Sequence, residues 1–303
     1  MPLTNFQERA IFGTLYAGVV IVGILSGPAA LLCIAMVVLF ACWKEFTTIQ
    51  QLSPIASWGI AIINLFFFGA SFAGTEFLST NTIYSITAIL FLLLATILLF
   101  TAATNAIKEM SAVLAGSLYL SLPILLFLYL PQMGNLTPPE NLNYWNWQSH
   151  LGWPWESLPV HPELTGHLPN YQWQYPMLVF ILIWSSDTFA YLTGKAIGKH
   201  PLHTLLSPKK TWEGFLGGTI LTAATSAILF HYWDLGSPVA AIILGAAFSI
   251  FGTAGDLFES ALKRVHSIKD SGNFIPGHGG ALDRFDAFLF GCVVFWAWLN
   301  FLS

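Results

Sequence analysis

Residues 255–286 hold the densest group of ionisable side chains in this sequence, GDLFESALKRVHSIKDSGNFIPGHGGALDRFD. The window contains five acids, four Lys or Arg residues, two His and a Gly-rich turn, although charged residues make up only 9% of the chain. Ionic groups that are scarce elsewhere and gathered here indicate a chemical role for this window.

The first acids of the window have helical spacing. Asp256, Glu259 or Ser260, and Lys263 would share one face of a helix, at the point where it leaves an apolar run. A salt-bridged surface stripe is the structural alternative. The functional interpretation is favoured because further acids and cations follow within the same window.

A Gly-rich turn, Ile275–Gly280, comes next, and its three glycines can expose successive amide groups to a phosphate. A plain connector would have a similar sequence. Asp283 and Asp286 then stand three residues apart at the expected start of the last helix, so that both carboxylates point the same way. A helix cap is the structural alternative for Asp283.

Asp187 lies inside an apolar run that is long enough to be a membrane helix. An ionisable residue at that depth usually faces the interior of a helix bundle, has a partner and marks a functional site. A purely structural cluster with the neighbouring Ser185, Ser186 and Thr188 is the alternative.

Two adjacent lysines occur in Ser207–Gly214. Ser207 followed by Pro predicts the N-cap and first residue of a helix, which would place Lys209 and Lys210 in its first turn. Cations are disfavoured at that end of a helix unless an anion binds there. Lysines that merely flank a membrane helix on the cytoplasmic side are the alternative.

Carboxylates that gather beside phosphate-binding groups favour Mg²⁺, with water and substrate phosphates completing its shell. The sequence has neither a His/Cys ligand set for zinc nor a GxxxxGK[ST] phosphate loop. Mg²⁺ with Lys and Arg side chains is what phosphoryl or nucleotidyl transfer needs. A lipid phosphate is already ionised at neutral pH, so it can attack without a strong general base.

The elements that must position these groups are membrane helices. The chain is 55% hydrophobic with a mean hydropathy of +0.68, and its apolar runs approach the ~20 residues needed to cross a bilayer. We therefore expect an all-α, polytopic membrane protein of about nine transmembrane helices, in which the first span is retained rather than cleaved. The expected spans are 11–26, 28–43, 57–74, 83–101, 111–130, 176–193, 212–233, 237–255 and 284–301.

The Lys and Arg residues predict the orientation. With the N-terminus in the cytoplasm, all eleven fall in cytoplasmic segments or at cytoplasmic helix ends, which brings loops 194–211 and 256–283 to one face. The opposite loop, 131–175, is rich in Trp and is expected to lie at the headgroup level rather than to bind a ligand. We divide the chain into N-terminal helices with this loop, 1–175, and a catalytic transmembrane region, 176–303.

The polar segments together resemble the signature of phosphatidate cytidylyltransferases (CDP-diacylglycerol synthases). The matching run is Ser260-x2-Lys263-Arg264-x4-Lys269-Asp270-x4-Ile275-Pro276-Gly277-His278-Gly279-Gly280-x-Leu282-Asp283-Arg284-x-Asp286, and it extends upstream through Ser207–Gly214 and Asp187. Phe189 departs from the pattern, where a small residue is expected. The N-terminal spans agree only in being apolar.

The resemblance implies that CTP and phosphatidate react to give CDP-diacylglycerol and pyrophosphate, with Mg²⁺ held by Asp256 and Asp283. It implies catalytic roles for these two residues and for Lys263, Arg264 and Asp286. The substrate-binding residues that it implies are Asp187, Ser207, Lys209, Lys210, Thr211, Glu213, Lys269, Asp270, His278, Gly279, Gly280 and Arg284.

The implied partners are CTP, phosphatidate and the lipid bilayer, and a homodimer is one of the assemblies left open. The weak net charge of −4 and the lack of a basic stripe argue against nucleic acid. A short chain of this kind is typical of bacteria, so we expect the plasma membrane, with the site facing the cytoplasm. A related transferase acting on another lipid, a cation-coupled transporter and a scaffold protein are the alternatives.

Overall fold

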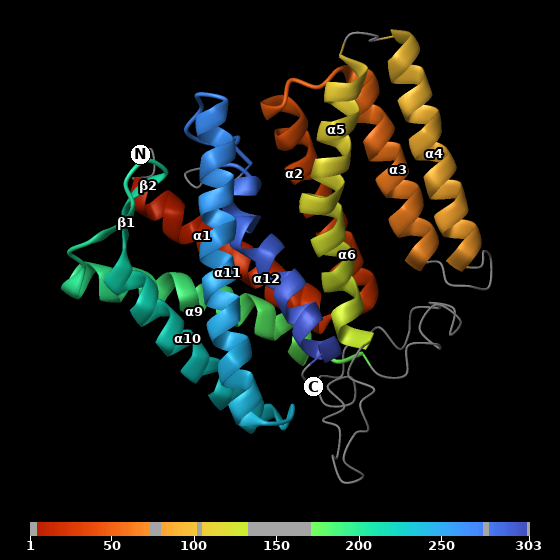
Figure 1. Cartoon of the computed structure of the whole chain (residues 1–303). Coiled ribbons are helices and arrows are strands. Elements are labelled where there is room, and N and C mark those ends of the chain that lie inside the picture. Colours follow the sequence, from red (N-terminus) through yellow and green to blue (C-terminus); the bar gives the residue numbers. More distant parts are fainter. Residues whose placement is uncertain (1–4, 73–79, 102–104, 133–170, 275–278, 302–303) are drawn as a thin grey trace.

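The computed structural model describes residues 5–72, 80–101, 105–132, 171–274 and 279–301, which are almost entirely helical (Figure 1). A two-stranded antiparallel hairpin is the one sheet within these ranges. The predicted all-α class is thus confirmed, with this small addition. Residues 133–170 of the Trp-rich loop lie outside the described ranges.

Four helices begin the chain: α1 (Asn5–Leu25), α2 (Pro28–Ile49), α3 (Pro54–Phe72) and α4 (Thr80–Thr101). Gly27 separates the first two with a φ of 104°, which an L side chain rarely adopts, and Pro28 then begins α2. Helices α1 and α2 contact each other, as do α3 and α4. Figure 1 shows α3 and α4 at one edge of the molecule, with the β-hairpin at the other.

The next span is α5 (Ala106–Gly116), a π-helical turn η1 (Ser117–Ser121), α6 (Leu122–Tyr129) and the short 3₁₀ turn η2 (Leu130–Gln132). Pro123 has no amide hydrogen, so the regular hydrogen-bond pattern cannot continue through it. The Leu122 amide instead reaches back to the Ser117 carbonyl, which widens the helix locally.

The C-terminal part comprises α9 (Gln174–Ile197), β1 (Pro201–His203), β2 (Ser207–Thr211), α10 (Trp212–Trp233), α11 (Pro238–Val265) and α12 (Leu282–Phe301). Small residues allow these helices to approach closely. A side chain at Gly218 of α10 would overlap Ala190 of α9, and one at Gly245 of α11 would overlap the α10 backbone. Each helix therefore packs against its successor.

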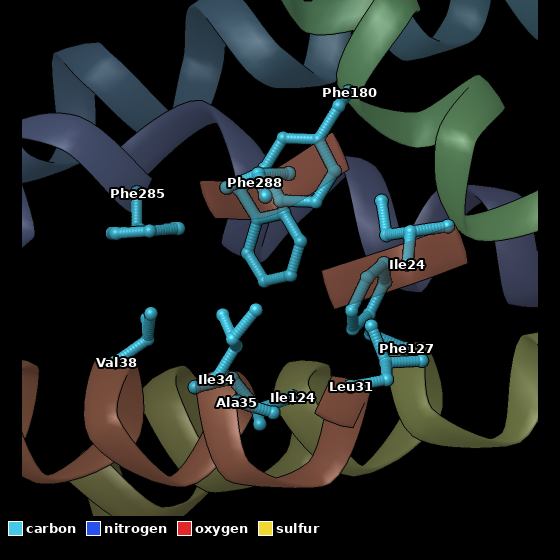
Figure 2. Close-up of a pocket in the computed structure, with 11 residues that line it drawn as sticks. Ile24, Leu31, Ile34, Ala35, Val38, Ile124, Phe127, Phe180, Phe285 and Phe288 are labelled. Carbon is cyan, nitrogen blue, oxygen red and sulfur yellow. The ribbon is translucent and has the colours of Figure 1, made fainter. Parts of the chain in front are cut away.

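Helix α12 is central, because it contacts α11, α9, α6 and α2. Figure 2 shows a small apolar pocket beside it, where Phe288 and Phe180 face Ile34 and Ala35 of α2. Phe288 lies 4.9 Å from Phe127 and 5.4 Å from Phe180 between ring centroids. The apolar core is continuous from α1 to α12, so the N-terminal helices support the helix that carries Asp283 and Asp286.

Seven helical segments of the described residues are long and apolar enough to cross a membrane, and a shorter apolar segment spans Ile11–Leu25. The expected span at 284–301 is not among the seven, and α12 carries charged residues in its first turns. The polytopic class is confirmed, whereas the expected number of nine is not established. Helix α11 also continues to Val265, ten residues beyond its predicted end.

Candidate functional site

The β-hairpin between α9 and α10 corrects one sequence prediction. Residues 207–211 form strand β2, with Pro201 opposite Thr211, and α10 begins only at Trp212. Thr211 is the N-cap, because its hydroxyl accepts a hydrogen bond from the Gly214 amide at 3.2 Å. The two lysines are therefore in an extended strand rather than in the first turn of a helix. In a strand, neighbouring side chains point in opposite directions.

The strand directs only one of the lysines toward the signature helices. Lys210 forms an ion pair with Asp256 of α11, whereas Lys209 is exposed. The Ser260 hydroxyl lies 3.4 Å from Asp256, one turn along the helix. Asp187 of α9 is subject to the charges of Lys210 and Asp256, so α9, β2 and α11 contribute to one group of charges.

Lys263 organises a second group. Its ammonium lies 2.6 Å from Glu259, four residues earlier on α11, and 2.6 Å from Asp283 in the first turn of α12. The other oxygen of Asp283 accepts hydrogen bonds from the Ser271 amide, the Ser271 hydroxyl and the Gly280 amide at 2.8–3.1 Å. Asp283 is thus oriented by four donors.

The two groups lie at successive levels of an antiparallel helix pair. Gly255 packs against the backbone of Asp286, since a side chain at Gly255 would overlap the Asp286 carbonyl. Asp286 accordingly lies level with Asp256, and Asp283 lies level with Glu259, with which it shares the ammonium of Lys263. Three helical residues correspond to ~4.5 Å along the axis, so the inner level (Asp256, Asp286, Lys210 and Asp187) is about one turn from the outer one.

In the part of the Gly-rich turn that the structure describes, the Gly280 amide is occupied, and the phosphate-binding role of the whole turn stays a prediction. Gly279 has a φ of 86°, which suits glycine, and the Gly280 amide donates to Asp283. The next two amides, of Ala281 and Leu282, donate to Glu45 of α2. These three amides hold carboxylates of the protein itself rather than being free for a phosphate. His278 lies outside the described residues.

A model of the family described as "Cytidylyltransferase family" matches residues 7–302. The chain belongs to the cytidylyltransferase family. A segment of 125 residues is 46% identical to the phosphatidate cytidylyltransferase of Bacillus subtilis (strain 168), and covers 41% of this chain and 46% of that relative.

Two staphylococcal relatives with the same printed name are also similar. The chain is 46% identical over 118 residues to that of Staphylococcus aureus (strain COL), and 44% identical over 117 residues to that of Staphylococcus haemolyticus (strain JCSC1435). Each match covers 38% of this chain and 45% of the relative. The chain thus spans about half the length of the curated relatives that it matches.

Other predicted site residues of this cytidylyltransferase family member are exposed. Arg264 donates to the Ile268 carbonyl at 3.2 Å, beyond the end of α11, and Lys269 and Asp270 are exposed. Arg284 is exposed next to Asp283, and its charge acts on Asp187.

The Glu213 carboxylate is held by contacts within the protein instead of being open to a ligand. It accepts hydrogen bonds from the Lys199 and His200 amides at 3.1 and 3.2 Å, and lies 2.5 Å from the His200 ring. It therefore anchors the start of the hairpin to α10. Ser207, at the opposite end of β2 from the helix, pairs with His203 across the hairpin.

Sequence reasoning missed Glu45 and Ser271, whereas the Glu259–Lys263 ion pair is the salt bridge that it gave as the structural alternative. Glu45 comes from α2, more than 200 positions before its partners, and the signature contains no N-terminal residue. A signal was nevertheless present, because Glu45 is one of few acids in the first hundred residues and follows a long apolar run. Charges at such positions are commonly functional or paired.

The candidate metal ligands of the site are carboxylate oxygens, which Mg²⁺ prefers. The described residues contain no group of three or more His, Cys, Asp or Glu residues placed to hold a metal ion. Mg²⁺ is commonly held by one or two carboxylates together with substrate phosphates, so a smaller set is compatible with it. Glu259 also has a buried oxygen, Oε1, without a hydrogen-bond partner among the described groups. The residues therefore fit a cation of this kind.

Proposed function

We propose that the chain transfers the cytidylyl group of CTP to phosphatidate, giving CDP-diacylglycerol and pyrophosphate. The printed names of its relatives and its family membership support this choice of substrates. The observation that carries the proposal is the two-level cluster of carboxylates and lysines where α11 and α12 meet. Such a cluster suits a reaction between two polyanions, which need both cations and oriented ligands.

In this reaction a phosphate oxygen of phosphatidate attacks the α-phosphorus of CTP. The new P–O bond forms as the bond from that phosphorus to the bridging oxygen of the β-phosphate breaks, and pyrophosphate leaves with its electron pair. Asp256 and Asp283 would hold Mg²⁺, which supplies charge neutralisation at the phosphate oxygens when bound. Lys210 and Lys263 lie beside these carboxylates and can bind phosphate oxygens of CTP or pyrophosphate.

The position of the cluster also suits the substrates. It lies at the ends of apolar helices, where the phosphate of a lipid can be reached while its acyl chains stay in the hydrocarbon. The Lys and Arg distribution supports a site on the cytoplasmic side, where CTP is available. The bacterial source of the relatives supports the plasma membrane.

The test uses the full chain purified in detergent and incubated with phosphatidate, Mg²⁺ and CTP labelled in the cytosine ring. We expect label to enter the organic phase, and chelation of Mg²⁺ with EDTA to prevent this until excess Mg²⁺ is restored. Asp256→Asn is the inactive control. Absence of labelled lipid product in the wild type, under conditions where the chain is folded, would refute the proposal.

A second lipid substrate distinguishes transfer to phosphatidate from the reaction of a related transferase that acts on another lipid. With a polyprenyl phosphate in place of phosphatidate, we expect little labelled product. Preferential transfer to the polyprenyl phosphate would assign the site to another lipid, while leaving the nucleotidyl-transfer chemistry in place.

A further inference from the structure

Glu45 lies near the end of α2, and its carboxylate contacts two segments that are distant in the sequence. One oxygen accepts a hydrogen bond from the Ala281 amide at 2.8 Å, and the other accepts one from the Leu282 amide at 2.9 Å. The Ser271 hydroxyl lies 2.8 Å from the second oxygen. These amides begin α12, where helical N–H groups have no partner within the helix. A negative charge is also favoured at that end of a helix.

Glycines on both sides of the turn leave space for this carboxylate. A side chain at Gly272 would overlap the carboxylate of Glu45, and one at Gly280 would overlap both Ser271 and Glu45. The segment before the turn and the segment after it therefore close around one side chain. Because that side chain belongs to α2, the N-terminal helices hold both ends of the turn.

Ser271 connects Glu45 to Asp283. Its hydroxyl lies 2.8 Å from Glu45 and 3.0 Å from Asp283, and its amide donates to Asp283 at 3.1 Å. A hydroxyl has one proton to donate, so the two carboxylates share it. Ser271 thus links Glu45 to Asp283, and Asp283 is also bound by Lys263.

We propose that Glu45 is a positioning residue for cytidylyl transfer, which fixes the start of α12 and the Ser271 loop and thereby orients Asp283. The proposal rests on the proposed function and adds to it a residue outside the signature. Glu45 acts through Asp283 and touches no substrate. Its role requires a carboxylate, since three donors converge on two acceptor oxygens.

Glu45→Gln replaces one of these oxygens with an amide group that can only donate, so at least one donor loses its partner. Residues that orient a metal ligand typically contribute 10–100-fold to activity, and we expect kcat to fall by about that factor. The KM for CTP should change little, because the lysines that can bind its phosphates keep their positions. Ser271→Ala should lower kcat as well, and the double variant should lose less than the product of the two effects.

Glu109→Gln is the matched control. Glu109 is a further acid of the N-terminal half, more buried than Glu45, and its carboxylate accepts a hydrogen bond from Ser53 at 2.5 Å, between α5 and the start of α3. It belongs to neither level of the site. A general effect of removing a carboxylate from the N-terminal helices would appear in both variants, whereas a positioning effect would appear only in Glu45→Gln.

Amide hydrogen exchange provides a measurement that does not need activity. In the full chain in detergent, Glu45→Gln should speed exchange at Ala281 and Leu282, and Glu109→Gln should leave it unchanged. Unchanged exchange in Glu45→Gln, or an equal loss of kcat in both Gln variants, would overturn the proposal. If Glu45→Gln does not fold, Ser271→Ala decides it by the same two measurements.

The exchange result is also independent of the reaction catalysed. A wild-type chain that does not use CTP and phosphatidate, but shows the expected change in exchange, would refute the proposed function and retain the contact. If the wild type is active and Glu45→Gln changes neither exchange nor kcat, the proposed function is retained and the role of Glu45 is refuted.

Discussion

Replacing Lys210 by Met, with Lys209→Met as its neighbour control, tests whether the hairpin strand orders the site. Strand geometry places the two side chains on opposite faces, and only Lys210 reaches Asp256. Had the two lysines been in the first turn of a helix, both would have lain close to the same helix end. The strand therefore predicts unequal effects from two adjacent and chemically identical substitutions.

The magnitude follows from the exposure of the pair. The Lys210 and Asp256 side chains are 30% and 31% exposed, so solvent screens part of their attraction. A hydrogen bond to a charged group contributes roughly 1.5–3 kcal/mol, and exposed ion pairs contribute less than about 1 kcal/mol. A bond from Lys210 to a CTP phosphate, at the same partial exposure, would contribute an intermediate value near 1.5–2 kcal/mol to transition-state binding, and its loss corresponds to about 10–30-fold in kcat/KM.

The assay measures transfer of label from CTP into CDP-diacylglycerol over a range of CTP concentrations. Lys210→Met should lower kcat/KM for CTP by that factor, whereas Lys209→Met should change it by less than about threefold, as for most surface substitutions. In a double-mutant cycle read on the melting temperature in detergent, Lys210→Met and Asp256→Asn should be non-additive. Equal effects of the two lysine substitutions would refute the assignment of Lys210 to the site.

Three further substitutions test the site and its support. Asp283→Asn should abolish measurable transfer while the chain still inserts into membranes, because four donors converge on that carboxylate; Asp234→Asn, at the end of α10, should retain activity. Phe288→Ala should lower the free energy of unfolding by roughly 3–5 kcal/mol, read as a lower melting temperature in detergent, whereas Phe100→Ala, 82% exposed, should have little effect. Glu213→Gln should raise the KM for CTP less than Lys210→Met does, since it loosens the hairpin without removing a cation.

The positions of the helices could be predicted because apolar length is a strong signal. Each expected span corresponds to a helix in the described residues, and the span at 212–233 has the bounds of α10. The end of α11 was predicted too early, since hydropathy falls at Asp256 while the helix continues through the charged residues. Hydropathy reports where the membrane would end, and hydrogen bonding decides where the helix ends.

The hairpin could not be predicted from local signals, because Ser207 followed by Pro is an ordinary start of a helix. The competing signal was Thr211, which has the same capping ability and lies directly before Trp212. Pairing of β1 with β2, Pro201 with Thr211 and His203 with Ser207, holds residues 207–211 extended. Local capping preferences thus allowed two starts, and a contact ten residues away selected one of them.

The acids of the site were found from their density and from the resemblance, but their pairing needed coordinates. Helical spacing placed Asp256 and Lys263 on one face, whereas the structure separates them into two levels with different partners. The role of Glu45 could not follow from spacing at all, since its partners Ala281 and Leu282 come 236 and 237 residues later in the chain.

The charge balance of the two levels leads to a last prediction, on the order in which ligands bind. The inner level has Asp187, Asp256 and Asp286 with Lys210, and the outer level has Glu259 and Asp283 with Lys263. In each level the carboxyl groups outnumber the single ammonium group. Ionising all of these carboxyl groups needs a further cation, and without one they would oppose the approach of CTP, so a cation should bind first.

Mg²⁺ should therefore stabilise the folded chain in the absence of any nucleotide. At a concentration 100 times its dissociation constant, one bound ion adds about 2.7 kcal/mol to the free energy of unfolding, which raises the melting temperature. NaCl at the same ionic strength is the control for screening, and Asp256→Asn should reduce the effect of Mg²⁺. If Mg²⁺ raises the melting temperature only when CTP is also present, the nucleotide brings the ion with it, and the carboxylates of the two levels are balanced by the protein itself.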